Sequence, residues 1–367
     1  MKLMYLSLLL TVFYLINGLF YLFAIYKLLK IKKDRNEYLL DIYPFVSVIV
    51  PSRNEADNIS KCINSLLSQN YPKDKYEIIP VNDGSDDETK NLLENYTLKF
   101  PQINLINIES KLSCGKLNAI DKGILKSKGE IIITTDADVW MRKNWIKSMV
   151  KDFDLKTGMI VGLAIEKLNN KLITAFQALD ACVIRIVSAS LIEMKMPITC
   201  QGANLAFKKD VYFEVRERVL SLAKKYGNRE WLMQEIDLAT KWNIKTQCTK
   251  DSIVSTNSPI NWLDLINQRS RWASTGKQYS KKIIRIYLLL IYLSMLNFIL
   301  IPFLFNLQLV SVFWLIKFII DILVAFSIIK ILEMPRLAVG FPLVFILQPV
   351  IVVVSGLLGS FNLYRWK

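Results

Sequence analysis

The sequence predicts an α/β domain with a mostly parallel sheet, joined to transmembrane helices. Apolar runs typical of buried strands alternate with helical segments between residues 45 and 135. Long uncharged apolar runs lie near both ends of the chain. The composition fits both parts, because 52% of the residues are hydrophobic and 22% are charged. A wholly soluble protein would be less apolar, and a pure membrane bundle would carry fewer charges.

The predicted strands and helices of the α/β domain follow one another in order. Strands are expected over residues 45–50, 76–81, 103–108 and 130–135. Helices are expected over residues 55–69, through Leu92 and Leu93, and over residues 115–125. This alternation is typical of a parallel sheet that is covered on both faces. A Gly-x-Gly-x-x-Gly sequence is absent, which argues against a nicotinamide-binding domain.

A first transmembrane helix is expected at the N-terminus. Residues 3–26 carry no charge over 24 residues. As a helix they would be ~36 Å long, enough to cross a hydrocarbon core of ~30 Å. Five basic residues follow between Lys27 and Arg35. By the positive-inside rule they place the N-terminus outside and the next domain in the cytosol.

About three further spans are expected at the C-terminal end. Residues 286–316 hold no charge but are too long for one span, so a turn is expected at residues 306–308. Further spans are expected over residues 309–329 and 337–363. The first of these contains Lys317 and Asp321, which are four residues apart. They can pair on one helix face, or alternatively mark an ion pathway.

These observations divide the chain into three predicted domains. Residues 1–36 form the N-terminal transmembrane helix with its basic flank, and residues 37–282 form the cytosolic domain. Residues 283–367 form the C-terminal transmembrane region. Three C-terminal spans would leave Arg365 and Lys367 outside, against the positive-inside rule, so a re-entrant segment stays an alternative.

Charge and residue usage exclude several functional classes. The net charge of +15 could serve nucleic acid, an anionic membrane surface or anionic substrates. Much of it flanks the apolar spans, where membrane topology explains it, and we expect no nucleic-acid partner. The five cysteines form no Cys-x-x-Cys pair. There is no histidine, so proton transfer falls to Asp, Glu, Lys, Tyr or Cys.

Two carboxylates end the fourth predicted strand. Asp136 and Asp138 lie one residue apart, and they would point the same way if the chain stayed extended. Ligands of open α/β sheets bind outside the carboxyl ends of the strands. Two carboxylates there would hold a hard divalent cation, which in turn holds phosphates. A solvated acidic loop is the alternative.

Two further candidates lie near predicted strand ends or helix starts. Asp83 follows the second strand and could accept a hydrogen bond from a nucleobase or a ribose, or belong to a capping turn. Lys116 follows Cys114 and Gly115 at a helix start, where it could hold a phosphate or be solvated.

The later part of the domain holds two more candidates. Glu235 and Asp237 are expected at the head of a helix, where they would interact with the helix dipole or supply a catalytic base. Residues 259–282 are expected to form a basic helix suited to the membrane interface. Its residues Gln268, Arg271 and Trp272 could bind a diphosphate and an acceptor sugar, or anchor the helix.

Six motifs follow one another in an order that carries a resemblance. They are Val50-Pro51-Ser52-Arg53-Asn54-Glu55, Val81-Asn82-Asp83-Gly84-Ser85-Asp86-Asp87, Gly115-Lys116-Leu117-Asn118-Ala119, Asp136-Ala137-Asp138, Gln234-Glu235-Ile236-Asp237-Leu238 and Gln268-Arg269-Ser270-Arg271-Trp272. Together they resemble the inverting family 2 glycosyltransferases of the GT-A fold over about residues 45–276. The membrane-bound members include hyaluronan, chitin-oligosaccharide and cellulose synthases and ceramide glucosyltransferase.

The resemblance implies a nucleotide-diphospho-sugar transferase domain with a Rossmann-like sheet. Asp83 would bind the base, which we expect to be uracil, and Lys116 would lie near the nucleotide. Asp136 would face the ribose and the metal, and Asp138 would ligate a cation, Mg²⁺ or Mn²⁺. Gln268, Arg271 and Trp272 match the family's Gln-x-x-Arg-Trp pattern and would bind the diphosphate and the acceptor.

The base position departs from the family pattern. Where the family has Glu followed by Asp, this chain has Gln234 followed by Glu235. Glu235 is the expected base, and Asp237 is the alternative.

The implied function is a metal-dependent, inverting, hexosyltransferase-type transfer in the cell membrane. The chain would be multi-pass, with its catalytic domain cytosolic. A nucleotide-sugar donor, a membrane-associated lipid or short glycan acceptor and membrane lipids are the expected partners. A processive polysaccharide synthase is one alternative. A catalytically silent membrane scaffold that keeps the fold is another.

Overall fold

The computed structural model describes residues 1–35, 43–109, 115–169, 171–226, 231–259, 261–279 and 282–365. The chain forms two compact units. The sheet unit comprises Leu28–Ile165 and Leu191–Asn257. The helical unit comprises Met1–Lys27, Glu166–Ser190 and Ser258–Lys367.

The sheet unit contains a seven-stranded sheet in the order β3-β2-β1-β4-β8-β6-β9. The strands are β1 (Val46–Ser52), β2 (Tyr76–Asn82), β3 (Ile106–Asn107), β4 (Ile131–Thr135), β6 (Thr157–Gly162), β8 (Asn204–Lys208) and β9 (Asn243–Gln247). Strands β3, β2, β1 and β4 run parallel, as do β6 and β9, and β8 runs antiparallel to both β4 and β6. A smaller sheet has the order β5-β10-β7, with β5 (Val139–Trp140), β7 (Ala164–Glu166) and β10 (Val254–Thr256). The predicted α/β class with a mainly parallel sheet is therefore confirmed.

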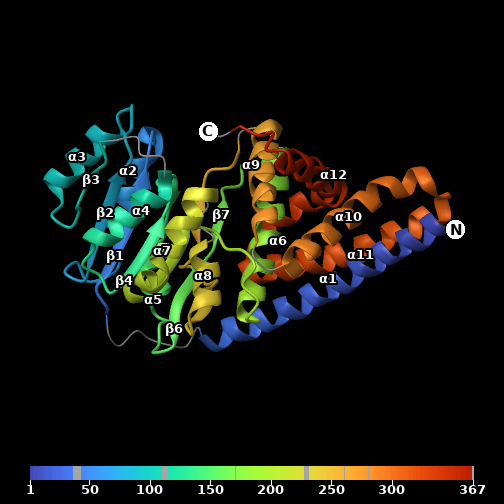
Figure 1. Ribbon diagram of the computed structural model, residues 1–367, viewed down its shortest axis with the longest axis horizontal. Coiled ribbons are helices and arrows are strands. Elements are labelled where there is room, and N and C mark those ends of the chain that lie inside the picture. Colours follow the sequence, from blue (N-terminus) through green and yellow to red (C-terminus); the bar gives the residue numbers. More distant parts are fainter. Residues whose placement is uncertain are drawn as a thin grey trace. The chain divides into compact units, whose positions relative to one another are not determined.

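Helices cover both faces of the large sheet. They are α2 (Ala56–Leu67), α3 (Thr89–Lys99), α4 (Gly115–Lys126), α5 (Trp145–Val150), α7 (Lys209–Tyr226) and α8 (Trp231–Ala239). Side chains alternate along β1, so Val48 packs with Ile63 of α2 on one face. Ile49 packs with Ile120 of α4 on the other face. Figure 1 shows α2 and α4 beside β1, β2 and β4. The fully buried β1 fits this double covering.

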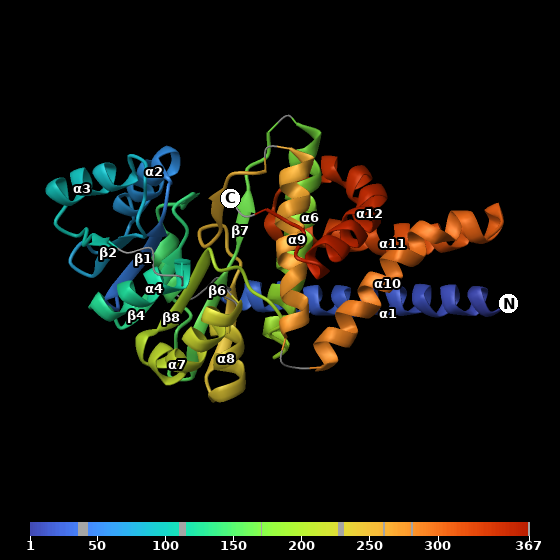
Figure 2. The ribbon, with the colours of Figure 1, turned by 45° about the horizontal axis from the view of Figure 1, so that its top comes forward.

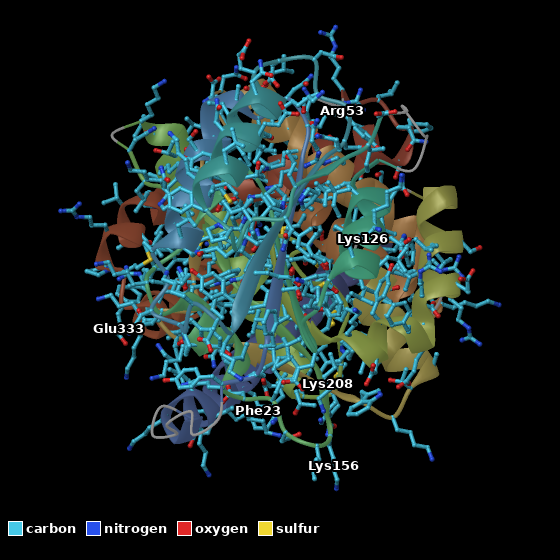
Figure 3. The ribbon with its side chains drawn as sticks, turned by 90° about the vertical axis from the view of Figure 1, so that its left-hand side faces the viewer. Phe23, Arg53, Lys126, Lys156, Lys208 and Glu333 are labelled. Atoms are coloured by element: carbon cyan, nitrogen blue, oxygen red, sulfur yellow. The ribbon has the colours of Figure 1, made fainter. Side chains whose placement is uncertain are left out.

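The carboxyl ends of the parallel strands lie at one edge of the sheet unit. Arg53 directly follows β1 at this edge. Lys208 ends the antiparallel β8, and it lies with Lys156 at the opposite end of the unit (Figure 3). Side chains that follow β1, β2 and β4 are therefore brought to the same edge, where ligands of such sheets bind.

The helical unit contains the long apolar helices. Its elements are α1 (Lys2–Arg35, up to Lys27), α6 (Leu172–Glu193, up to Ser190), α9 (Trp262–Ser274), η1 (Thr275–Gln278), α10 (Lys282–Leu304), α11 (Leu307–Leu332), η2 (Pro335–Gly340) and α12 (Phe341–Ser360). Among the described residues, five helical segments are long and apolar enough to cross a membrane: α1, α6, α10, α11 and η2–α12. In four of them 28–33% of the most apolar window is buried, against 78% in α6. The surface of α6 is therefore mostly covered by protein.

Helix α11 begins and packs as the sequence predicts. Asn306 caps it, accepting a hydrogen bond from the Leu309 amide at 3.0 Å, so the expected break between two helices is present, although residues 307 and 308 already belong to α11. Lys317 is fully buried and pairs with Asp321 on the same helix face. Lys317 also donates to the Phe345 carbonyl at 3.1 Å, and Tyr14 donates to Asp321. These contacts favour a self-neutralising pair over an ion pathway.

The structure differs from several expected elements. The strand expected over residues 103–108 is only Ile106–Asn107, with a separate bridge at Ile103. Strands β6, β8 and β9 and helix α6 were not predicted. The expected boundary at residue 282 differs from the compact units, because Glu166–Ser190 and Ser258–Lys367 group together. The expected boundary at residue 36 and Cys114 lie outside the described residues.

Candidate functional site

The loops after β1 and β2 form one wall of the candidate site. The Asp83 amide donates to the Ser52 carbonyl at 2.9 Å, so Asp83 lies beside the end of β1. The Asn54 amide donates to the Ser85 hydroxyl at 3.1 Å. Asn54 and Gly84 have φ values of 54° and 66°, in the left-handed region that Gly and Asn adopt most readily. These contacts hold Asp83 at the carboxyl edge.

Asp136 and Asp138 lie in a turn, not in an extended strand. Strand β4 ends at Thr135, and β5 begins at Val139. The expectation that the two carboxylates share a strand face is therefore wrong, because the chain turns there. They still lie close enough for the charge of Asp136 to affect Asp138.

Lys116 reaches this turn from the start of α4. Its Nζ lies 2.7 Å from Oδ1 of Asp136, with the two side chains 45% and 23% exposed. Asp138 accepts a hydrogen bond from the Thr256 hydroxyl at 3.4 Å. Three sequence-predicted residues, Lys116, Asp136 and Asp138, are therefore brought together.

The carboxylates at this edge are crowded by negative charge. Burial raises the pKa of Asp138, and so does the charge of Asp136, while Lys116 and Thr256 partly offset the rise. Burial also raises the pKa of Glu55, and Asp138 and Asp136 add to it, against the hydrogen bond from Asn58. A cation at this place would relieve the repulsion.

Asp136 and Asp138 fit a divalent cation whose remaining ligands are water and substrate phosphates. Among the described residues, no group of three or more Asp, Glu, His or Cys side chains gathers as a metal site. Asp136 and Asp138 offer the hard oxygen atoms that Mg²⁺ and Mn²⁺ prefer. Mg²⁺ is commonly bound by one or two carboxylates together with water and substrate phosphates. The two residues therefore fit a cation that is bound with a diphosphate.

Glu235 and Asp237 lie within α8 and not at its head. The helix begins at Trp231, so the expected position at the helix start is wrong by one turn. Glu235 is 8% exposed, and its Oε2 lies 3.8 Å from Nη1 of Arg218 on α7. The neighbouring Gln234 donates to the Ile198 carbonyl at 3.3 Å. The carboxylate of Glu235 therefore forms an ion pair with Arg218 in this structure.

Helix α7 also contacts the helix that carries Lys116. The buried Asp121 of α4 accepts hydrogen bonds from the Tyr212 hydroxyl at 2.7 Å and from Arg216 at 2.7 and 2.9 Å. Arg216 lies two residues before Arg218. One helix therefore holds α4 in place and carries the partner of Glu235.

Gln268, Arg271 and Trp272 lie on α9 in the helical unit. The Gln268 amide oxygen accepts from Gln177 of α6 at 3.5 Å. The Trp272 ring lies 4.2 Å from the guanidinium carbon of Arg269. The expected helix over 259–282 is shorter, spanning Trp262–Ser274, and its helical character is confirmed.

Two residues near the acidic turn had no role assigned from the sequence. Glu55 belongs to the first sequence motif. Its position shortly after β1, at the same edge of the sheet, could have predicted that it lies near the acidic turn. Thr256 lies in β10, which pairs with β5 directly after the acidic turn. Only the folded chain brings Thr256 to Asp138.

The family model for glycosyl transferase family 2 matches residues 47–177. This part of the chain is therefore similar to a family 2 glycosyltransferase domain. The matched part begins in β1 and ends within α6, so it includes Asp83, Lys116, Asp136 and Asp138. The matched family consists of sugar-transferring enzymes.

Individual relatives agree with the family. A beta-monoglucosyldiacylglycerol synthase from Synechocystis is 24% identical over 258 residues, which cover 64% of this chain and 48% of that protein. A dolichyl-phosphate beta-glucosyltransferase from Trichomonas vaginalis is 38% identical over 100 residues, covering 26% of this chain and 29% of that protein. The first three curated relatives are matched over only 34%, 56% and 48% of their own lengths.

A solved structure shows the same fold. A mannosyltransferase from Pyrobaculum calidifontis, in complex with GDP-mannose and Mn²⁺, aligns with a TM-score of 0.56 at 15% identity. The alignment covers 98% of this chain and 97% of that one. The GT-A fold expected from the motifs is therefore confirmed, and the described long apolar helices are suited to crossing a membrane.

Proposed function

We propose that the chain is an inverting glycosyltransferase that moves a sugar from a nucleoside diphosphate to a membrane-associated acceptor. The observation that carries the proposal is the cluster of Lys116, Asp136 and Asp138 at the carboxyl edge of a family 2 domain. Such a cluster suits a diphosphate bound together with a cation. We propose a uridine donor, with Asp83 accepting from the base.

The chain's own residues would divide the work of the reaction. Asp136 and Asp138 would hold Mg²⁺ or Mn²⁺, which supplies charge stabilisation to the departing diphosphate when bound. Lys116 would place a second positive charge beside the phosphates. Arg271 would add a bidentate contact to the diphosphate, and Gln268 and Trp272 would contact the acceptor or donor sugar.

Inversion requires the acceptor oxygen to attack from the face opposite the leaving diphosphate. That hydroxyl is a weak nucleophile near neutral pH, so a base must take its proton as the new bond forms. We propose Glu235 for this role and Asp237 as the alternative. The proton passes to a Glu235 carboxylate oxygen, the glycosidic bond forms, and the bond from the anomeric carbon to the diphosphate breaks.

The acceptor we propose is the hydroxyl of a lipid or a short lipid-linked glycan. The long apolar helices support a membrane-associated acceptor. The names of two relatives, a glucosyldiacylglycerol synthase and a dolichyl-phosphate glucosyltransferase, support the same class.

The proposal is tested with purified protein in lipid nanodiscs and a panel of UDP- and GDP-sugars with Mg²⁺ or Mn²⁺. We expect transfer to extracted membrane lipids from one donor, and a product of one or few sugars on a gel. Asp138→Asn is the matched control and should be inactive. If every donor remains intact in the presence of lipid, or the control variant is equally active, the proposal is wrong. A long polymer would instead identify a processive synthase.

We also propose a multi-pass topology with the sheet unit in the cytosol. The basic residues between Lys27 and Arg35, which follow the first apolar helix, support this orientation. Lys156→Cys places a thiol on an exposed position of the sheet unit, and Lys2→Cys places one near the N-terminus. A membrane-impermeant maleimide should label only the second in intact cells. Labelling of Lys156→Cys without permeabilisation would contradict the orientation.

A further inference from the structure

The helical unit contains a buried cluster of four charged side chains. Their exposed fractions are 2% for Glu166, 4% for Asp180, 8% for Arg185 and 6% for Arg269. Buried charges are costly unless they are paired. Two acids and two bases here make the cluster neutral as a whole.

The four charges form two pairs that connect three elements. Both terminal nitrogens of Arg185 donate to the two carboxylate oxygens of Glu166, which joins α6 to the end of β7. Nη2 of Arg269 lies 2.6 Å from Oδ2 of Asp180, which joins α9 to α6. Figure 2 shows α6 and α9 side by side over this region.

Helix α9 is held from a second side by α12. A Cβ built on Gly359 would lie 2.3 Å from the Ser270 carbonyl oxygen, so the two helices touch at backbone distance. On the α6 side, Gln177 donates to Gln268. The segment between Gln268 and Trp272 is therefore enclosed by its neighbours.

The Asp180–Arg269 pair is poorly suited to stabilising the fold. Nε, Nη1 and Nη2 of Arg269 are all buried, and none of them makes a hydrogen bond within the described residues, so Nη2 meets Asp180 as a close charge pair. A buried ion pair with unsatisfied donors can be replaced by apolar residues with little loss of stability. The pair does hold α9 to α6, because separating it would leave two opposite charges buried without a partner. The Arg269 guanidinium also lies over the Trp272 ring.

We infer that Asp180 and Arg269 are positioning residues whose buried ion pair fixes the segment Gln268–Trp272 for sugar transfer. This inference rests on the proposed function of that segment. It assigns no direct contact with donor or acceptor to either residue. Their effect passes through the orientation of α9, and a misplacement of about 1 Å at a reacting group can lower a rate about 100-fold.

The test uses a double variant, Asp180→Leu with Arg269→Met, in the full-length protein in nanodiscs. Both charges are removed together, so neither is left buried without its partner. The matched control is Lys317→Met with Asp321→Asn, which removes a separate buried pair of the helical unit. The asparagine introduced in that control keeps a side-chain oxygen that can accept from the Tyr14 hydroxyl.

Three measurements distinguish positioning from general destabilisation. In the Asp180/Arg269 double variant we expect faster hydrogen exchange of the amides of residues 262–274, kcat lowered about 100-fold, and an unchanged melting temperature. The control should keep wild-type exchange in residues 262–274 and wild-type kcat.

Two results would overturn the inference. One is wild-type exchange in residues 262–274 of the double variant, and the other is faster exchange there with an unchanged kcat. If the wild-type protein transfers no sugar, the proposed function fails, while the exchange measurement still decides whether the pair holds α9.

Discussion

Replacing Lys116 by methionine should tighten cation binding while it weakens donor binding. In the described structure the Lys116 ammonium lies 2.7 Å from the Asp136 carboxylate that we propose as a cation ligand. A cation that binds Asp136 must therefore compete with this charge. Methionine keeps the aliphatic stem and removes only the competitor, and it also removes a positive charge from the proposed diphosphate site.

The size of the effect follows from the exposure of the pair. The two side chains are 45% and 23% exposed, so solvent screens their attraction to about 1 kcal/mol. Since 1.4 kcal/mol corresponds to a tenfold change in an equilibrium constant, Lys116→Met should bind Mn²⁺ about fivefold more tightly in the absence of donor. Donor affinity at saturating Mn²⁺ should fall by a similar or larger factor.

Calorimetric titration of the purified protein with Mn²⁺ alone, and then with UDP at saturating Mn²⁺, measures both changes. Lys126→Met is the control, because Lys126 is exposed near the end of the same helix. It should leave both affinities unchanged. Weaker Mn²⁺ binding by Lys116→Met would refute the competition, and unchanged UDP binding would remove Lys116 from the donor site.

Three further predictions concern the base, the cation and the α4–α7 contact. Glu235→Gln should lower kcat by roughly two to four orders of magnitude with UDP binding nearly unchanged, and Asp237→Asn should cost much less; the reverse order would make Asp237 the base. EDTA should abolish transfer and added Mn²⁺ should restore it, whereas full activity in EDTA without carried-over metal would exclude a catalytic cation. Asp121→Asn should destabilise the sheet unit by about 2 kcal/mol, seen as a lower melting temperature, because it weakens charged hydrogen bonds to Arg216; an unchanged melting temperature would contradict this.

The N-terminal half of the sheet was predictable because its signals are local. Strands β1, β2 and β4 are short apolar runs bounded by polar turns, and both of their faces are covered. Strand β8 lacked such a signal, because Gln201, Gly202 and Ala203, which directly precede it, are typical of a turn. Its place between β4 and β6 depends on pairing with strands far apart in the sequence.

Helix α6 was not predicted because charged residues interrupt its apolar sequence. Asp180 and Arg185 interrupt an otherwise apolar run, and only the fold supplies their partners, Arg269 and Glu166. Glu235 was expected at the start of its helix but lies one turn inside α8. A motif fixes residue order, but the start of α8 at Trp231 is set by packing of its apolar side chains in the core.

The charge balance at the sheet edge argues that donor and cation bind together. Glu55, Asp136 and Asp138 repel one another there, and the positive charge of Lys116 opposes this repulsion. A nucleoside diphosphate brings further negative charge to this place. Lys116 alone cannot offset both the carboxylates and the phosphates, because its one charge is already shared with Asp136. A divalent cation held by Asp136 and Asp138 would offset this repulsion, so donor binding should depend on the cation before any chemical step begins.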